Sequence, residues 1–116
     1  MYINLDTVKI FVRFGATDMR KSINGLSILV SEAMEKDAFS GSLFVFCSRN
    51  RKVLKALYWD GTGFWLLQKR LEKPHRFPWP KSGTGAREIN SDQLKMLLSG
   101  INFWGAHTRL PYRSVV

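Results

Sequence analysis

The chain has 116 residues, of which 45% are hydrophobic and 23% are charged. This length fits one folded domain, and the composition excludes a disordered or collagen-like chain. Lys and Arg total 18 against 9 Asp and Glu, and this net charge of +9 favours an anionic partner: nucleic acid, an acidic membrane or an acidic protein.

The N-terminal third predicts a strand followed by a long helix. Side chains over residues 8–14 alternate loosely between two faces, which predicts a strand ended by Gly15. A stripe of apolar residues at helical spacing then predicts a helix from about Asp18 to Glu35, capped by Thr17 or Asp18. The stripe consists of Met19, Ile23, Leu26, Val30, Ala33 and Met34.

The middle of the chain is typical of a β-meander, with strands predicted over residues 42–48, 52–59 and 64–71. The first of these is apolar on both faces, as a central strand would be. Asp60-Gly61 lies between the second and third, and this pair supplies the positive φ angles that a hairpin turn needs. Residues 76–80 are bounded by prolines and fit an edge strand at best.

The C-terminal part predicts a short extended stretch over residues 87–90 and then a helix. Asn90 and Gln93 have the spacing of a helix cap, and Gly100 is well placed to end that helix. The predicted fold class is α+β: a small antiparallel β-meander sheet packed with one long N-terminal helix and one short C-terminal helix. We expect one domain over residues 1–104 and an irregular tail over residues 105–116.

Cysteine content and hydropathy predict a cytoplasmic protein without a membrane partner. Cys47 is the single cysteine, so no internal disulfide forms, and it is expected to be a small buried hydrophobe. The N-terminus lacks the basic region and long apolar run of a signal peptide. No apolar stretch is long enough to span a membrane.

No constellation typical of an enzyme stands out, so we expect no catalytic residue, metal or cofactor. Cys47 and the two histidines, His75 and His107, are too widely separated to suggest a zinc site. A minor alternative is a metal-dependent nuclease that uses Asp18, Asp60 and Glu72. Ordinary roles as a helix cap, a turn residue and a member of a charged segment account for these three better.

The distribution of charge is the most informative feature. Nine basic and two acidic residues stand between Arg49 and Lys81, a net +7 of the chain's +9, interleaved with aromatic residues. Such a pattern is typical of surfaces that contact phosphates and stack on bases, although the aromatics are also needed for a core. The candidate phosphate contacts here are Arg49, Arg51, Lys52, Lys55, Lys69, Arg70 and Arg76. Arg20 and Lys21, near the start of the predicted helix, form a second candidate patch.

Three ordered strings resemble the TnpB accessory proteins of the insertion-sequence 66 family of bacterial transposable elements. They are GATDMRKSINGL (residues 15–26), FSGSLFVFCSRNRKVLKALYWDGTGFWLLQKRLEKPHRFPWP (39–80) and SDQLKMLLSGINF (91–103). The most specific parts are Thr17 to Ser22, Phe39 to Gly41, Leu43 to Phe46 and Tyr58 to Phe64, followed by Lys69 to Leu71. The resemblance covers nearly the whole chain.

The resemblance implies a non-catalytic accessory protein encoded beside a larger transposase that carries the catalytic acids. Two hypotheses follow for its role. In the first, the basic hairpins bind the DNA of the element ends, mainly through phosphates. In the second, the protein is an adaptor that docks on the transposase through exposed Trp79 and Trp104 and through Tyr112 of the tail, while its charge steers association or maintains solubility.

Overall fold

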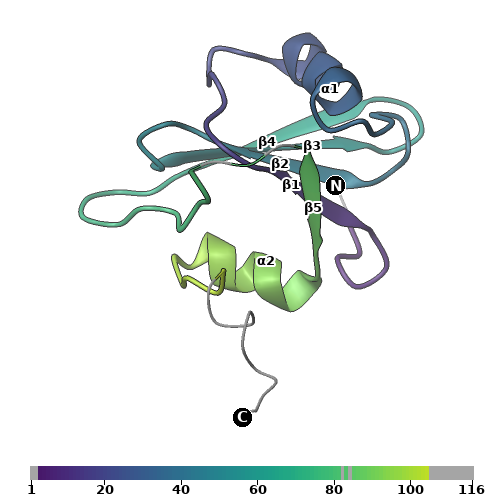
Figure 1. Ribbon diagram of the computed structural model, residues 1–116. Helices are drawn as coiled ribbons and strands as arrows, with labels where there is room; N and C mark the ends of the chain where they lie inside the picture. The colour runs from purple at the N-terminus through teal and green to yellow at the C-terminus, as the bar shows by residue number, and fades with distance from the viewer. Residues whose placement is uncertain (1–2, 82, 84, 105–116) are drawn as a thin grey trace.

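The protein, seen in a computed structural model that describes residues 3–81, 83 and 85–104, is built on a five-stranded sheet. Figure 1 shows helix α1 over one face of the sheet and helix α2 over the other. The elements in chain order are β1 (Ile10–Arg13), α1 (Ile23–Glu32), β2 (Leu43–Cys47), β3 (Val53–Trp59), β4 (Phe64–Arg70), β5 (Ala86–Ile89) and α2 (Ser91–Leu98). The predicted tail over residues 105–116 lies outside the described residues and stays a prediction.

The sheet is mixed, with the strand order β4-β3-β2-β1-β5. The predicted meander of β2, β3 and β4 is confirmed, because each of these strands runs antiparallel to the next. The prediction of a wholly antiparallel sheet is wrong at β1, which lies parallel to β2 with Ile10 opposite Leu43. The physical reason is the crossover through α1, which returns the chain to the same end of the sheet before β2 starts.

Helix α1 is shorter than the apolar stripe predicts and spans ten residues. Residues 17–22 form a turn instead, in which the Asp18 carboxylate accepts a hydrogen bond from the backbone N–H of Arg20 at 2.9 Å. The N-cap is therefore Ser22 and not Thr17 or Asp18. Asx turns of this kind compete with helix for the same backbone groups, and periodicity alone does not reveal them.

Helix α2 confirms the predicted cap. The Asn90 side chain accepts from the backbone N–H of Gln93, while the Gln93 side chain accepts from the backbone N–H of Asn90. This capping box satisfies two donors at the helix start. Because α2 has eight residues and α1 has ten, the predicted contrast between a long and a short helix is wrong. Neither helix in the described part of the chain is long and apolar enough to cross a membrane.

Two apolar cores lie on the two faces of the sheet, because side chains alternate along each strand. Leu26 and Val30 of α1 pack on one face, against Phe11, Phe44, Phe46 and Leu57. Leu94 and Leu97 of α2 pack on the other, against Val12, Val45, Cys47, Leu54 and Ala56. The sheet is therefore the middle layer between the two helices, and loops connect the strands at its two ends.

The segment over residues 76–80 is not an edge strand. Phe77 and Trp79 are buried in the core beneath α2, and the Phe77 backbone N–H donates to the carbonyl of Arg51 at 2.7 Å. The Gly15 N–H donates to the carbonyl of Pro80 at 3.1 Å. These contacts hold residues 76–81 beside the loops that follow β1 and β2.

Candidate nucleic-acid interface

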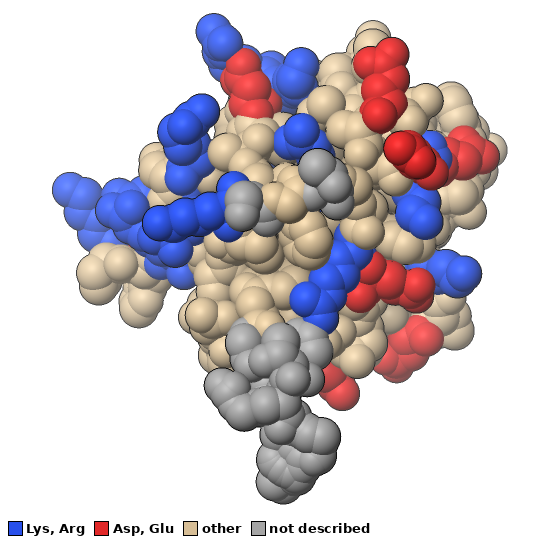
Figure 2. Space-filling view, viewed as in Figure 1, with Lys and Arg blue, Asp and Glu red and all other residues tan. Residues whose placement is uncertain are grey.

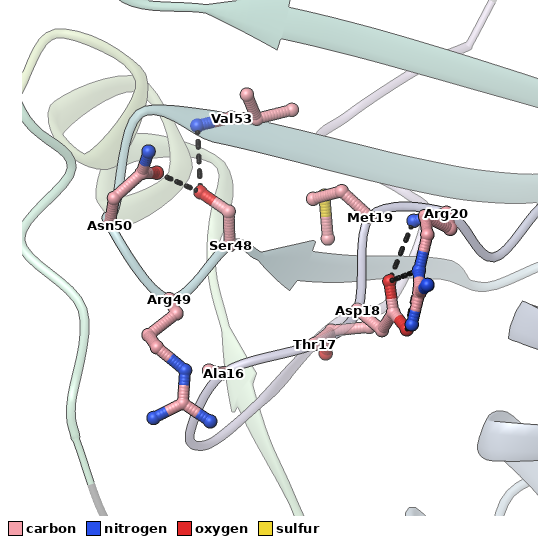
Figure 3. A pocket seen from close by; sticks show the side chains of 9 residues that line it. All are labelled: Ala16, Thr17, Asp18, Met19, Arg20, Ser48, Arg49, Asn50 and Val53. Atoms are coloured by element: carbon pink, nitrogen blue, oxygen red, sulfur yellow. Dashed lines mark hydrogen bonds and ion pairs between the residues drawn. The ribbon is translucent and has the colours of Figure 1, made fainter.

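A groove lies where the parallel strands β1 and β2 end. Two loops follow these strands at the same end of the sheet, residues 14–22 and residues 48–52. They enclose a hollow of about 690 Å³ lined by residues 16–20, 48–50 and 53, shown in Figure 3. A second hollow of about 270 Å³ shares Ala16, Ser48 and Arg49 with it and extends to residues 79–81. We call the two together the basic groove.

The turn between β2 and β3 is built by Ser48 and Asn50. The Ser48 hydroxyl donates to the Asn50 side-chain oxygen at 2.7 Å and accepts from the backbone N–H of Val53 at 3.1 Å. The Asn50 side-chain oxygen also accepts from the backbone N–H of Lys52 at 3.1 Å. These local bonds use the small polar side chains inside the turn (Figure 3). The guanidinium groups of Arg49 and Arg51 have no recorded ion pair within the described residues.

Arg51 occupies a backbone conformation that favours glycine. Its φ angle is +62°, in the left-handed region, where the Cβ of an L-residue crowds the neighbouring carbonyl. Its backbone N–H donates to the Ser48 carbonyl at 3.0 Å, so the turn holds it in this conformation. An arginine thus stands at a turn position where glycine has the lower conformational energy.

The opposite wall of the groove is the turn that carries Arg20. The Arg20 guanidinium donates to the Asp18 carboxylate, with a closest distance of 2.8 Å. This hydrogen bond lowers the pKa of Asp18 to about 2. The Arg20 side chain is nevertheless 92% exposed, so it can exchange this surface carboxylate for another anion.

Lys55 of β3 anchors the loop that carries Arg20 to the sheet. Its ammonium group donates to the carbonyls of Met19 at 2.8 Å and of Lys21 at 2.9 Å. The side chain is buried, with 9% of its surface exposed. Lys55 therefore differs from the other predicted phosphate contacts: its charge lies under the loop and acts on the position of Arg20 and Lys21.

The remaining predicted contacts divide into two groups. In the first group, Arg20, Arg49 and Arg51 line the basic groove, Lys21 and Lys52 adjoin lining residues in the chain, and Arg76 donates to the Asn50 carbonyl at 3.4 Å. All six are exposed or half-buried. The second, Lys69 and Arg70, lies on the edge strand β4. There Lys69 donates to the Leu98 carbonyl at 3.0 Å, and Arg70 pairs with Glu72 at 3.0 Å. Figure 2 shows basic side chains gathered at the left, while acidic side chains lie mainly at the right.

The phosphate contacts predicted from the sequence do not include Lys81. Lys81 lines the second hollow and is exposed. It reaches the groove because the backbone bond between Gly15 and Pro80 brings its segment there. The buried Trp79 beside it anchors the same segment. The sequence signal for Lys81 was its position at the end of a stretch of aromatic and proline residues. The hydrogen bond between Gly15 and Pro80, which brings this stretch to the groove, is a long-range contact that a local pattern does not reveal.

The tryptophans expected as exposed anchors are held inside the fold. Trp79 is 6% exposed, and its indole N–H donates to the carbonyls of Arg13 and Gly15 at 3.0 and 3.1 Å. The expectation that Trp79 is exposed is therefore wrong. Trp104 is half-buried and donates its indole N–H to the Pro78 carbonyl. Tyr112 lies outside the described residues.

The three carboxylates of the nuclease alternative have separate structural partners. Asp18 pairs with Arg20, and Glu72 pairs with Arg70. Asp60 accepts from the backbone N–H of Thr62 at 2.8 Å and from the Trp65 indole at 2.8 Å, and these bonds depress its pKa. Over residues 3–81, 83 and 85–104, no three His, Cys, Asp or Glu side chains gather where they could hold a metal ion.

Comparisons with known proteins place the chain in a family. A family model described as "IS66 Orf2 like protein" matches residues 8–108. The chain is 40% identical over 96 residues to the uncharacterized protein y4hO of Sinorhizobium fredii (strain NBRC 101917 / NGR234), an alignment that covers 83% of each chain. It is 32% identical over 106 residues to the uncharacterized protein y4jC of the same strain. This second alignment covers 91% of this chain and 89% of y4jC. No solved structure matches. The chain belongs to the IS66 Orf2-like family.

Proposed function

We propose that the protein is a non-catalytic accessory factor of transposition that binds DNA through backbone phosphates at the basic groove. Membership of the IS66 Orf2-like family supports an accessory role associated with transposition. The observation that supports DNA contact is the position of Arg49 and Arg51. They stand on a turn in which the Ser48 and Asn50 side chains already form the local hydrogen bonds. Guanidinium groups form bidentate hydrogen bonds to phosphate and suit this task.

The groove supplies cations on three sides. Arg20, with Lys21 next to it in the chain, comes from the loop after β1, Arg49 and Arg51 come from the turn after β2, and Lys81 comes from the third segment. Asp18 is the one acidic residue among those lining the two hollows. An approaching phosphate backbone therefore meets a local excess of positive charge, which accelerates encounter and releases counterions.

Lys69 and Arg70 are left out of the proposed contact set. Both belong to the edge strand β4, and neither lines either of the two hollows. Lys55 is left out because it is buried and positions the loop instead. The set that we propose is Arg20, Lys21, Arg49, Arg51, Lys52, Arg76 and Lys81.

Fluorescence anisotropy across a salt series tests this set. The double variant Arg49→Ala/Arg51→Ala is compared with Lys9→Ala/Lys95→Ala, which removes the same charge from two exposed residues outside the groove. Loss of two phosphate contacts flattens the slope of log K against log salt by about 1.8, since each contact contributes about 0.9. The control pair is expected to change the slope far less. Equal effects of the two pairs would refute the groove as the DNA site.

DNA from the element's terminal inverted repeat and a scrambled duplex distinguish the two roles. Phosphate contacts weaken equally on both duplexes when the groove arginines are removed. A transposase-docking adaptor instead predicts a tight protein complex and DNA binding no better than that of any basic protein. The exposed apolar residues of β4, Trp65 and Leu67, favour a protein contact in addition.

A further inference from the structure

Strand β4 is an edge of the sheet with an open row of backbone groups. It pairs with β3 on one side, and no other described strand pairs with it. The Leu71 N–H donates to the Lys52 carbonyl at 2.8 Å, which fixes the alternation of this ladder. In an antiparallel pair, successive residues direct their backbone groups to opposite sides. Leu67 and Lys69 therefore bond to β3, whereas Leu66 and Gln68 point their N–H and C=O groups outward.

The same strand exposes apolar side chains. Trp65 is 41% exposed and Leu67 is 38% exposed, although both are large hydrophobic residues. They lie on the face of the sheet that α2 covers, in register with Tyr58 and Ala56. Leu67 also lines an apolar hollow of about 370 Å³ between the sheet and α2. An open edge and an apolar hollow thus adjoin at one strand.

The charge of this edge indicates what fits it. The C-terminal half of β4 carries Lys69 and Arg70, and Lys73 follows shortly after. Glu72 is the one acidic residue from 61 to 81, and it pairs with Arg70. Two copies of this chain would each bring a charge of +9 to a shared edge, which opposes self-pairing. An acidic segment is the complementary occupant.

We propose that β4 accepts an extended acidic segment of a partner protein as a sixth strand. Main-chain bonds to Leu66 and Gln68 supply affinity, as in other complexes formed by strand addition. Apolar side chains of the segment lie against Trp65 and Leu67 on the α2 face of the sheet. Acidic side chains at two successive positions of the segment lie beside Lys69 on that face and beside Arg70 on the opposite face. This docking site is separate from the basic groove, and it goes beyond the proposed DNA contact.

The probe is a labelled peptide of the length of β4, with alternating Val and Thr in one half and two successive Glu residues in the other half, so that one Glu lies on each face of the sheet. Matched peptides carry Gln or Lys in place of Glu. The full chain is expected to bind the Glu peptide about fivefold more tightly than the Gln peptide, because two exposed ion pairs add modestly. Bound peptide slows hydrogen exchange at the N–H groups of Leu66 and Gln68, while those of Leu67 and Lys69 are already protected by β3. Absence of binding, or protection elsewhere, would overturn the proposal.

Two variants sharpen the test. Gln68→Pro removes one outward N–H without breaking a bond to β3, since proline is tolerated on the solvent side of an edge strand. It is expected to abolish peptide binding and leave DNA affinity unchanged. Lys69→Glu/Arg70→Glu is expected to reverse the preference from the Glu peptide to the Lys peptide. A charge-reversed variant that still prefers the Glu peptide would contradict the proposal. A chain that is a dimer in solution and becomes a monomer when Gln68 is replaced by proline would also contradict it, because β4 would then pair with a second copy of the chain.

Discussion

Replacing Arg51 by glycine separates stability from DNA binding at a single position. The left-handed conformation at φ +62° costs a non-glycine residue about 1–2 kcal/mol, and the variant removes this cost. Glycine also makes the unfolded chain more flexible, which costs about 0.5–1 kcal/mol. The net expectation is a gain of about 0.5–1 kcal/mol in the free energy of unfolding, or about 2–4 °C in Tm for a chain of this size.

The same replacement is expected to weaken DNA binding about tenfold at low salt. A hydrogen bond from arginine to a charged phosphate contributes about 1.5 kcal/mol, and the glycine variant loses it. Chemical denaturation and anisotropy measure the two effects on one protein sample. Arg51→Ala is the matched control, because it removes the charge and keeps the strained conformation. It is expected to lose affinity without the gain in stability.

Either of two results would refute this reasoning. A glycine variant that is more stable and binds DNA as well as the parent chain would remove Arg51 from the interface. A glycine variant that is less stable would mean that the Arg51 side chain stabilises the turn by more than its backbone conformation costs.

Three further predictions concern buried or hydrogen-bonded groups. Lys55→Met leaves the carbonyls of Met19 and Lys21 without their hydrogen-bond donor. It is expected to lower the free energy of unfolding, measured by urea denaturation, by about 1–3 kcal/mol. An unchanged denaturation midpoint would contradict the role of Lys55 in holding the loop. The Asp60 carboxylate has a depressed pKa because the Thr62 N–H and the Trp65 indole donate to it, so it stabilises the fold above about pH 4, its ordinary range, and loses this effect as the pH falls toward the folded-state value. Asp60→Asn should therefore flatten the acid limb of stability against pH, and an identical limb in the variant would count against this account. Burial raises the pKa of Cys47 to about 12, so roughly one thiol in ten thousand is ionised at pH 8. A disulfide reagent should therefore label Cys47 very slowly in the folded chain and rapidly in the urea-unfolded chain.

Local patterns predicted the elements whose causes are local. The β2-β3-β4 meander follows from alternation and from the Asp60-Gly61 turn, and the cap of α2 follows from Asn90 and Gln93. The start of α1 was misjudged because the carboxylate of Asp18 closes a turn that periodicity does not show. The parallel pairing of β1 with β2 depends on a crossover through α1, and no local pattern specifies where such a crossover returns.

The candidate site was predictable in charge and not in geometry. The excess of basic residues between Arg49 and Lys81 is visible in the sequence. Strand alternation correctly places Lys55 on one face of β3, yet it does not reveal that the loop over residues 17–22 covers this side chain. Trp79 likewise became a core residue because its segment folds back along the end of the sheet. Long-range contacts decided which cations and aromatics stay available to a partner.

A titration of the isotopically labelled chain with a DNA duplex, followed by amide chemical shifts, tests the central claim most directly. The largest shifts are expected in the three segments of the basic groove: residues 15–21, 48–52 and 80–81. Residues of α2, none of which lines the groove, serve as the internal reference and should shift little. Shifts spread evenly over all exposed lysines and arginines, or concentrated on β4, would contradict the groove as the DNA-binding surface.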